Sequence, residues 1–280
     1  MASQRRTLAL ALSGLLVPGL ALVTDSPRLP IWTRGDGYHR VVRVQGTKSP
    51  PGRLSQGAIS YISVLPDGTD LWRASEIRDI LNAGGCGVIP TDTSYSFVTL
   101  QSNKDGIERI LRMKGATTEK KTMSLLCKDI TTVTVFTKGV DKDMFKVLKK
   151  NLPGPYTFIL PASEQLPKMI YKEGKKKWKR KEIGIRIPDD PVCQALLEDL
   201  DEPLLASTVP TEPTEGGKKQ KSRTPTVSSP AAIGDAWCKQ VDFVLDAGER
   251  PGDGSTIFDF TIVGEPVLVR EGLGSLELRR

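Results

Sequence analysis

Residues 91–96 form a stretch whose side chains could hold a polar ligand. They supply one carboxylate, on Asp92, and five hydroxyl groups, on Thr91, Thr93, Ser94, Tyr95 and Ser96. A buried strand accepts such residues poorly, because each hydroxyl needs its own hydrogen-bond partner in the core. We therefore expect the apolar run before Pro90 to be a strand and residues 91–96 to be a loop at its end. Ligands of open α/β sheets bind at that edge, and an ordinary Ser/Thr turn is the alternative interpretation.

Four later stretches accompany this one in an order that is typical of a known family. Residues 90–95 read P-T-D-T-S-Y, and residues 151–160 read N-L-P-G-P-Y-T-F-I-L. They are followed by G-I-R-I-P-D-D-P at 184–191, S-T-I at 255–257 and P-V-L-V-R-E-G at 266–272. In these motifs the chain resembles the YrdC/YciO family of threonylcarbamoyl-AMP synthases and their relatives, and it is most similar to the YciO branch.

The resemblance implies an α/β fold of the YrdC kind. We expect an open, twisted, mixed parallel and antiparallel sheet with flanking helices, in a single domain that spans residues 57–275. Residues 1–56 would then be a targeting leader and linker. The strand-rich C-terminal part of the chain also favours a mixed sheet over a wholly parallel one.

The resemblance also implies an activity. L-threonine, bicarbonate and ATP would condense to threonylcarbamoyl-AMP and pyrophosphate, for the threonylcarbamoyladenosine modification of tRNA. Mg²⁺ would accompany the phosphates, because it neutralises the leaving pyrophosphate, and no metal ligand from the protein is expected. The alternative is a YciO-like protein that binds nucleotide or double-stranded RNA and has weak or different activity.

Site residues follow from the resemblance, position by position. Lys114 and Arg186 would be the catalytic cations. Substrate-binding residues would be Thr91, Tyr95 and Ser255, and nucleotide-binding residues would be Lys114, Thr157, Thr208 and Arg270.

Three cations of this set, Lys114, Arg186 and Arg270, lie at the ends of expected elements, beside hydroxyl-rich or glycine-rich turns. A surface ion pair is the commoner role of any lysine or arginine. Arg186 lies between Ile185 and Ile187, and a cation in an apolar setting requires a specific partner.

Three departures from the family pattern favour the YciO branch. The K-x-R motif of the synthases is replaced by Lys114-Gly115-Ala116, so one phosphate-binding cation is missing. The S-x-N motif is replaced by Thr208-Val209-Pro210, and Ser96 stands where the family has glycine. These changes leave the full synthase activity open.

The expected elements alternate between helices and strands from residue 60 onward. Leu71, Ala74, Ile77 and Leu81 define one apolar helical face that ends before Gly84. Further helices are expected at 103–113, 141–152, 192–200 and 231–239, and strands at 122–127, 156–160, 184–187 and 241–245. A hairpin would join residues 257–262 to 266–270, and the polar residues 210–229 would form a mobile loop that could act as a lid.

The charge of the 280-residue chain is concentrated in two places. The net charge is +7, with seven basic residues at 172–181 and four at 218–223. Basic runs favour contact with RNA, either tRNA or double-stranded RNA, although many such runs are solvated loops. A composition of 38% hydrophobic and 26% charged residues suits a globular protein with a substantial core.

Cysteine and histidine usage argues against two kinds of site. The four cysteines, Cys86, Cys127, Cys193 and Cys238, include no C-x-x-C pair, so a zinc site is not expected. Three of them lie in apolar contexts, where cysteine behaves as a small hydrophobic residue. The single histidine, His39, precedes the expected domain, which excludes a His-based triad there.

Residues 1–24 have the pattern of a targeting segment. Arg5 and Arg6 precede an apolar run that Pro18 and Gly19 interrupt, which makes it too broken for a comfortable membrane span. We favour a plastid as the destination, because an ATP-using enzyme has little substrate outside the cell. Mitochondrial import, the secretory pathway and a retained anchor stay open, and no stable membrane association is expected once the leader is removed.

Overall fold

The structure is a computed structural model. It describes residues 59–114, 123–167, 170, 172–173, 176–177, 181–210, 228–230, 233, 237, 239–262 and 266–280. The expected leader lies outside these residues, as does most of the expected loop at 210–229. The expected helix at 231–239 is described only in part.

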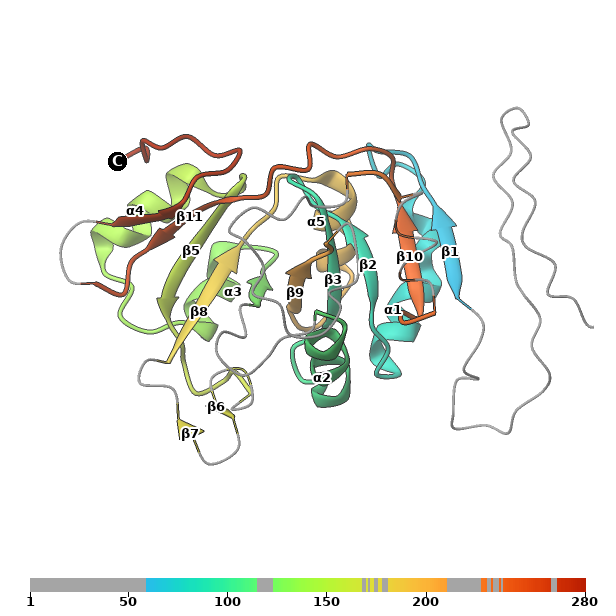
Figure 1. Ribbon diagram of the computed structural model, residues 1–280. Coiled ribbons are helices and arrows are strands. Elements are labelled where there is room, and N and C mark those ends of the chain that lie inside the picture. Colours follow the sequence, from blue (N-terminus) through green and yellow to red (C-terminus); the bar gives the residue numbers. More distant parts are fainter. Residues whose placement is uncertain are drawn as a thin grey trace, which may run out of the picture. The chain divides into compact units, whose positions relative to one another are not determined.

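In the described part of the chain, ten strands form one sheet, and two more pair in a small antiparallel sheet (Figure 1). The strands are β1 (Ser60–Ser63), β2 (Gly87–Pro90), β3 (Tyr95–Leu100), β4 (Ser124–Leu126), β5 (Tyr156–Pro161), β6 (Lys172–Glu173), β7 (Lys176–Lys177), β8 (Glu182–Arg186), β9 (Leu204–Thr208), β10 (Phe243–Asp246), β11 (Thr256–Asp259) and β12 (Val267–Arg270). The helices are η1 (Leu71–Ala74), α1 (Ser75–Asn82), α2 (Lys104–Met113), α3 (Ile130–Phe136), α4 (Lys142–Asn151) and α5 (Pro191–Glu198).

The strand order in the large sheet is β1-β10-β2-β3-β9-β4-β8-β5-β11-β12. β10 lies parallel to both β1 and β2, β4 lies parallel to β8, and β5 lies parallel to β11. The other five neighbouring pairs are antiparallel. The mixed open sheet with flanking helices is therefore confirmed.

Two separate apolar cores lie on the two faces of the sheet. Neighbouring residues of a strand go to different cores: Leu125 of β4 belongs to one and Leu126 to the other. This alternation follows from the two-residue period of a strand. Helices α2, α3 and α4 supply buried residues to the first core, and α1 and α5 supply them to the second. Cys86, Cys127 and Cys193 are free and buried in these cores, as expected of small hydrophobic residues.

The caps of the helices explain why the sequence predicted their boundaries well. The Asn103 side chain accepts a hydrogen bond from the Gly106 amide at the start of α2, and Asp141 accepts two amide bonds at the start of α4. Beyond α1, Gly84 has a φ of +87°, a conformation that favours glycine. Lys114 caps the C-terminus of α2, as expected.

Two elements differ from the expectation. β3 begins at Tyr95, so Tyr95 and Ser96 belong to a fully buried strand instead of a loop. The strand tolerates hydroxyls because they find partners: that of Thr99, for example, donates to the Gly85 carbonyl at 3.0 Å. Helix α3 was not predicted, because its sequence I-T-T-V-T-V-F is rich in β-branched residues that disfavour helix. The Asp129 cap and the burial of Val133 and Phe136 override that preference.

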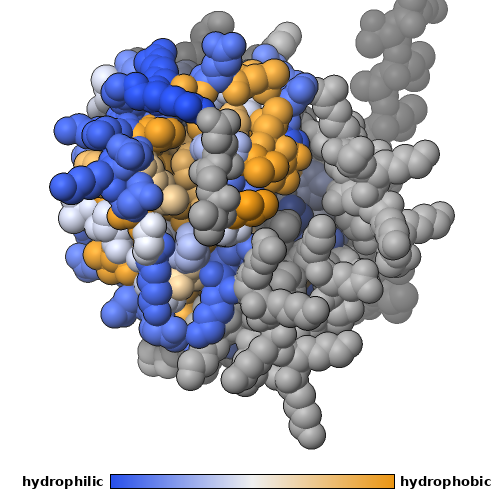
Figure 2. Space-filling model, turned by 90° about the vertical axis from the view of Figure 1, so that its left-hand side faces the viewer, coloured by the Kyte–Doolittle hydropathy of each residue, from blue (hydrophilic) through white to orange (hydrophobic). Residues whose placement is uncertain are grey.

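The sheet edge formed by β12 carries exposed apolar side chains. Figure 2 views this end of the molecule and shows apolar surface beside strongly hydrophilic surface. The exposed large residues of this region are Ile262, Val267, Leu268, Val269, Leu273 and Leu276. In the part of the chain that the structure describes, none of the helices has the length and apolar character needed to cross a membrane.

Candidate functional site

The turn between β2 and β3 organises the site, and it is held by its own hydroxyl groups. The Thr91 hydroxyl donates to the Ser94 carbonyl at 2.6 Å, and the Thr91 amide bonds the same oxygen at 3.0 Å. From outside the turn, the Gly252 amide donates to the Thr93 carbonyl at 2.7 Å. These bonds close a compact Ser/Thr turn, as the alternative interpretation expected, and ligand binding at this turn stays a prediction.

Asp92 projects from this turn into a buried ion pair with Arg186. The Nη2 atom of Arg186 donates to Asp92 Oδ1 at 2.6 Å, and both side chains are only 6% exposed. The same nitrogen donates to the Thr93 hydroxyl at 3.0 Å, and the other oxygen of Asp92 accepts the Asp189 amide at 3.2 Å. Burial raises the pKa of Asp92, and Arg186 opposes that rise. The specific partner that the setting of Arg186 demanded is therefore Asp92.

Lys114 is half-buried, and among the described residues no carboxylate forms an ion pair with it. Its ammonium donates to the Ser207 hydroxyl on β9 at 2.8 Å. Burial and, to a lesser degree, the positive charge of Arg270 lower the pKa of Lys114 to about 8. An anion that approaches a lysine in this setting stabilises its positive charge.

Arg270 belongs to a second polar group, at the other end of the site. Its guanidinium donates to the Ser255 carbonyl at 2.8 and 3.3 Å and to the Ser255 hydroxyl at 3.4 Å. The hydroxyls of Ser255 and Thr157 lie 2.7 Å apart, which joins β5 to the residue before β11. Burial and the charge of Arg186 lower the pKa of Arg270.

The structure thus brings together Lys114, Arg186 and Arg270, which we call the cation cluster. Arg270 acts on the pKa of Lys114, and Arg186 acts on that of Arg270, so Arg270 lies within electrostatic range of both other cations. Among the described residues, neither Lys114 nor Arg270 forms an ion pair with a carboxylate. Two buried polar atoms in this part of the molecule also lack a partner, Arg186 Nε and Ser94 Oγ. An arrangement of this kind suits an anionic ligand with several acceptor oxygens.

Three further predicted residues occupy different positions. Thr91 is engaged by the turn, and the Tyr95 hydroxyl donates to the Gly248 carbonyl at 2.7 Å and accepts the Ala247 amide at 3.1 Å. In this structure both hydroxyls therefore form hydrogen bonds with backbone groups of the protein itself. Thr208 is half-buried at the end of β9, opposite Ser96 and next to Ser207. The substrate-binding and nucleotide-binding roles of these residues stay predictions.

Sequence reasoning missed two contributors, Asp92 and Ser207. Asp92 was visible as the lone carboxylate among hydroxyls, but only the fold shows that it meets a cation 94 residues away. Ser207 precedes the Thr208 of the motif, and its contact with Lys114 depends on the packing of α2 against the sheet.

A metal ion has no evident binding group in the part of the chain that the structure describes. No three His, Cys, Asp or Glu side chains come together there in a way that could hold one. Asp92, the carboxylate of the site, is already committed to Arg186.

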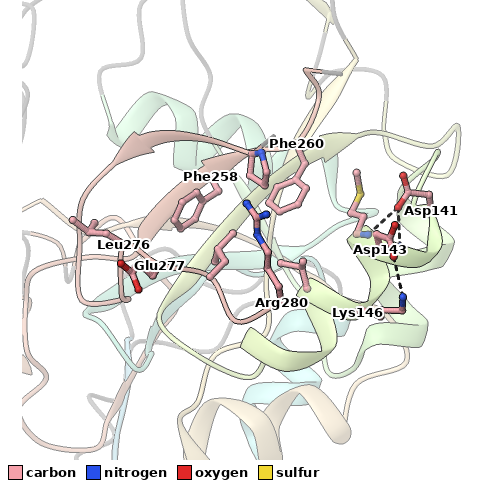
Figure 3. A pocket seen from close by; sticks show the side chains of 12 residues that line it. Asp141, Asp143, Lys146, Phe258, Phe260, Leu276, Glu277 and Arg280 are labelled. Carbon is pink, nitrogen blue, oxygen red and sulfur yellow. Dashed lines mark hydrogen bonds and ion pairs between the residues drawn. The ribbon is translucent and has the colours of Figure 1, made fainter. Parts of the chain in front are cut away.

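A separate pocket of about 820 Å³ lies away from these residues, beside α4. Its apolar part includes Phe258 and Phe260 of the β11 segment, and its polar rim includes Asp143 and Lys146 of α4, which pair at 2.9 Å. Figure 3 shows the two rings with Arg280 beside them and the two charged side chains across the pocket. None of the predicted site residues lines this pocket.

Comparison with known proteins identifies the family. A family model named for Sua5, YciO and YrdC, and described as telomere recombination, matches residues 79–272. The chain belongs to this family. YciO of Escherichia coli (strain K12) is 32% identical over 217 residues, which are 78% of this chain and 97% of that protein. The threonylcarbamoyl-AMP synthase of Homo sapiens is 27% identical over 69% of this chain and 64% of its own length.

Solved structures of the family have the same fold. The crystal structure of E. coli YciO superposes with a TM-score of 0.68 at 32% identity and covers 78% of this chain and 98% of that one. The crystal structure of Pyrococcus abyssi Sua5 complexed with L-threonine gives a TM-score of 0.63 at 22% identity, over 76% of this chain and 57% of that one. Family membership therefore agrees with the motifs and with the mixed sheet.

Proposed function

We propose that this protein condenses L-threonine, bicarbonate and ATP to threonylcarbamoyl-AMP and pyrophosphate. The observation that carries the proposal is the cation cluster, in which Lys114 and Arg270 lack carboxylate partners among the described residues. ATP brings phosphates and threonine brings a carboxylate, so both substrates supply the anions that such a site favours. The use of the product for modifying tRNA belongs to the same proposal.

The proposed chemistry needs positioning and charge neutralisation from the protein. The neutral amine of threonine forms a C–N bond to the carbon of bicarbonate and water is released, and an oxygen of the resulting carbamate attacks the α-phosphorus of ATP. The bond from the α-phosphorus to the bridging oxygen then breaks and pyrophosphate leaves with the electron pair. Lys114 and Arg270 would bind phosphate oxygens and stabilise the charge that develops on pyrophosphate. Mg²⁺ would arrive with ATP, since it is commonly bound through substrate phosphates.

The family relationship supports this proposal and also limits it. Relatives that match this chain include proteins named threonylcarbamoyl-AMP synthase from P. abyssi and Homo sapiens, at 23% and 27% identity. Identity to YciO is higher, at 32%. Pro210 and Ala116 also stand where the synthase motifs have asparagine and arginine. A nucleotide-binding protein with weak or different chemistry is therefore the second candidate, and Ala116 itself lies outside the described residues.

A pyrophosphate-release assay separates the two candidates. The purified chain is incubated with ATP, L-threonine and bicarbonate, with parallel reactions that lack threonine or bicarbonate. We expect slow release that requires all three substrates, is lost in Lys114→Ala and increases in Ala116→Arg. Release that is independent of threonine, or absent although ATP binds, would instead favour the second candidate.

RNA binding is a proposal of its own, based on the basic run at 172–181. Its part in β6 and β7 forms a small antiparallel hairpin. If the run contacts tRNA or double-stranded RNA, affinity should fall steeply with salt, because each neutralised phosphate releases counterions. Replacing Lys175, Lys176 and Lys177 by glutamine should flatten that dependence. An unchanged slope would mark the run as a solvated loop.

Import into a plastid is also a proposal, since it depends on residues 1–56 alone. A fluorescent protein fused after residue 56 would show the destination of this segment in plant cells. Plastid fluorescence is the expected result, and mitochondrial or secretory fluorescence would replace it with one of the alternatives.

A further inference from the structure

The Arg186 guanidinium is held on one side only. Both of its hydrogen bonds in the described structure, to Asp92 at 2.6 Å and to Thr93 at 3.0 Å, come from Nη2. Nε is buried and has no hydrogen-bond partner among the described residues. A buried donor without a partner costs free energy, so its position calls for a reason.

Asp92 is itself fixed by the backbone. Its second oxygen accepts the Asp189 amide at 3.2 Å, just before α5, whose N-cap is Asp190. The turn that carries Asp92 is closed by the Thr91 hydroxyl and anchored by the Gly252 amide. These bonds fix the position of the Asp92 carboxylate, and the Arg186 side chain takes the conformation that meets it.

From this geometry we propose that Asp92 is a positioning residue for anion binding. By holding Nη2 of Arg186, it orients the guanidinium so that the Nε–H donates to an oxygen of the anionic substrate. This inference rests on the proposed function, because it assigns a task within the same site. Asp92 itself does not touch the substrate.

Charge and orientation predict opposite effects of removing Asp92. If Asp92 acted only through its charge, removing a negative group beside the cation cluster would strengthen anion binding. If Asp92 orients Arg186, its removal frees the guanidinium and weakens binding, although the site becomes more positive. The sign of the change in affinity therefore separates the two roles.

Two substitutions with the same change in charge make the test. Asp92→Asn keeps an oxygen that can accept from Arg186, whereas Asp92→Ala keeps none. Inorganic pyrophosphate is titrated into the full chain by calorimetry, at one pH and one salt concentration. We expect Asp92→Ala to bind about ten- to hundredfold more weakly than Asp92→Asn, the range for losing one charge-assisted hydrogen bond. Equal affinities in the two variants would overturn the positioning role.

Asp242→Ala is the matched control. It removes another carboxylate that accepts from an arginine at 2.6 Å, namely Arg109, and that also accepts a backbone amide, that of Cys86. It should leave pyrophosphate affinity unchanged. If Asp242→Ala weakens binding as much as Asp92→Ala, the loss is a general structural effect and the assignment to Asp92 fails.

A second measurement observes binding in the unmodified chain, and a variant serves only to assign the resonance. The Arg186 Nε–H resonance, assigned by its absence in Arg186→Lys, should shift when pyrophosphate is added. A resonance that does not move while pyrophosphate binds would overturn the inference. A wild-type chain that binds neither pyrophosphate nor ATP would instead remove the proposed function, so the two failures are distinguishable.

Discussion

The cation cluster and the pocket beside α4 are two contrasting regions of this molecule. The pocket is large, with the aromatic rings of Phe258 and Phe260 on one side and an exposed ion pair on its rim. The cation cluster combines the buried Arg186 with the half-buried Lys114 and the exposed Arg270, and among the described residues Arg186 pairs with Asp92. The chemistry of the cation cluster, in contrast to that of the pocket, favours an anionic ligand.

The difference shows why buried, incompletely paired charge is the stronger indication of function. An apolar pocket costs the folded protein little free energy, because the side chains that line it also pack against the core. The half-buried ammonium of Lys114 has lost part of its hydration, which costs free energy and lowers its pKa. A binding partner that removes the cost explains why the arrangement exists. The predictions below test this contrast, beginning with the largest effect.

Breaking the buried ion pair should have the largest effect. Arg186→Ala leaves Asp92 charged and buried without its partner, so we expect the free energy of unfolding to fall by about 3–5 kcal/mol in urea denaturation. Arg78→Ala is the control, because Arg78 pairs with Asp199 at the surface. That exposed pair should contribute less than about 1 kcal/mol. Equal losses in the two variants would contradict a special cost of burial in the cation cluster.

A substitution at the pocket should lower the stability of the protein and leave its affinity for ATP unchanged. Phe258 is buried and stacks near Phe158 and Tyr156. Phe258→Ala should lower the free energy of unfolding by about 3 kcal/mol, the lower end for a buried phenylalanine, because one side of the ring borders the pocket. ATP affinity of the folded variant, measured by calorimetry, should equal that of the wild type. Weaker ATP binding would extend the functional region to the pocket.

Removing one cation should reduce affinity and leave the fold intact. Lys114→Ala deletes one charge-assisted contact to phosphate, of a kind that contributes about 1.5–3 kcal/mol, so ATP should bind about ten- to hundredfold more weakly. The circular dichroism spectrum should not change. Lys146→Ala, which removes an exposed lysine at the pocket, should leave ATP affinity as it is. The contrast fails if both lysines matter equally.

The smallest expected effect is a dependence on pH. Because the pKa of Lys114 is lowered to about 8, the folded protein loses this proton as the pH rises through about 8. ATP is fully ionised in this range, so its affinity should decrease from pH 7.5 to 9.5. Stability should move the other way: the unfolded chain binds more protons here, which favours the folded state as pH rises. Lys114→Arg should flatten the change in affinity, since arginine stays charged. A wild-type affinity that is constant over this range would contradict the lowered pKa.

Local signals predicted most of the fold. The caps Asn103 and Asp141 and the positive-φ Gly84 act within a few residues, so the boundaries of α1, α2 and α4 could be read from the chain. Helix α3 could not, because burial of Val133 and Phe136 outweighs an unfavourable local preference. The buried strand β3 escaped for a similar reason: its hydroxyls find partners, such as the Gly85 carbonyl, that are distant in sequence.

The sequence by itself determined which chemical groups are present: the hydroxyl-rich turn, the motifs of the family and the three cations. Local spacing was enough for this, because motifs and helix caps depend on near neighbours. Only the tertiary structure decided which groups meet. The partner of Arg186 is Asp92, 94 residues earlier in the chain, and that of Lys114 is Ser207, 93 residues later. Such contacts depend on the order and twist of ten strands, and no local pattern encodes that geometry.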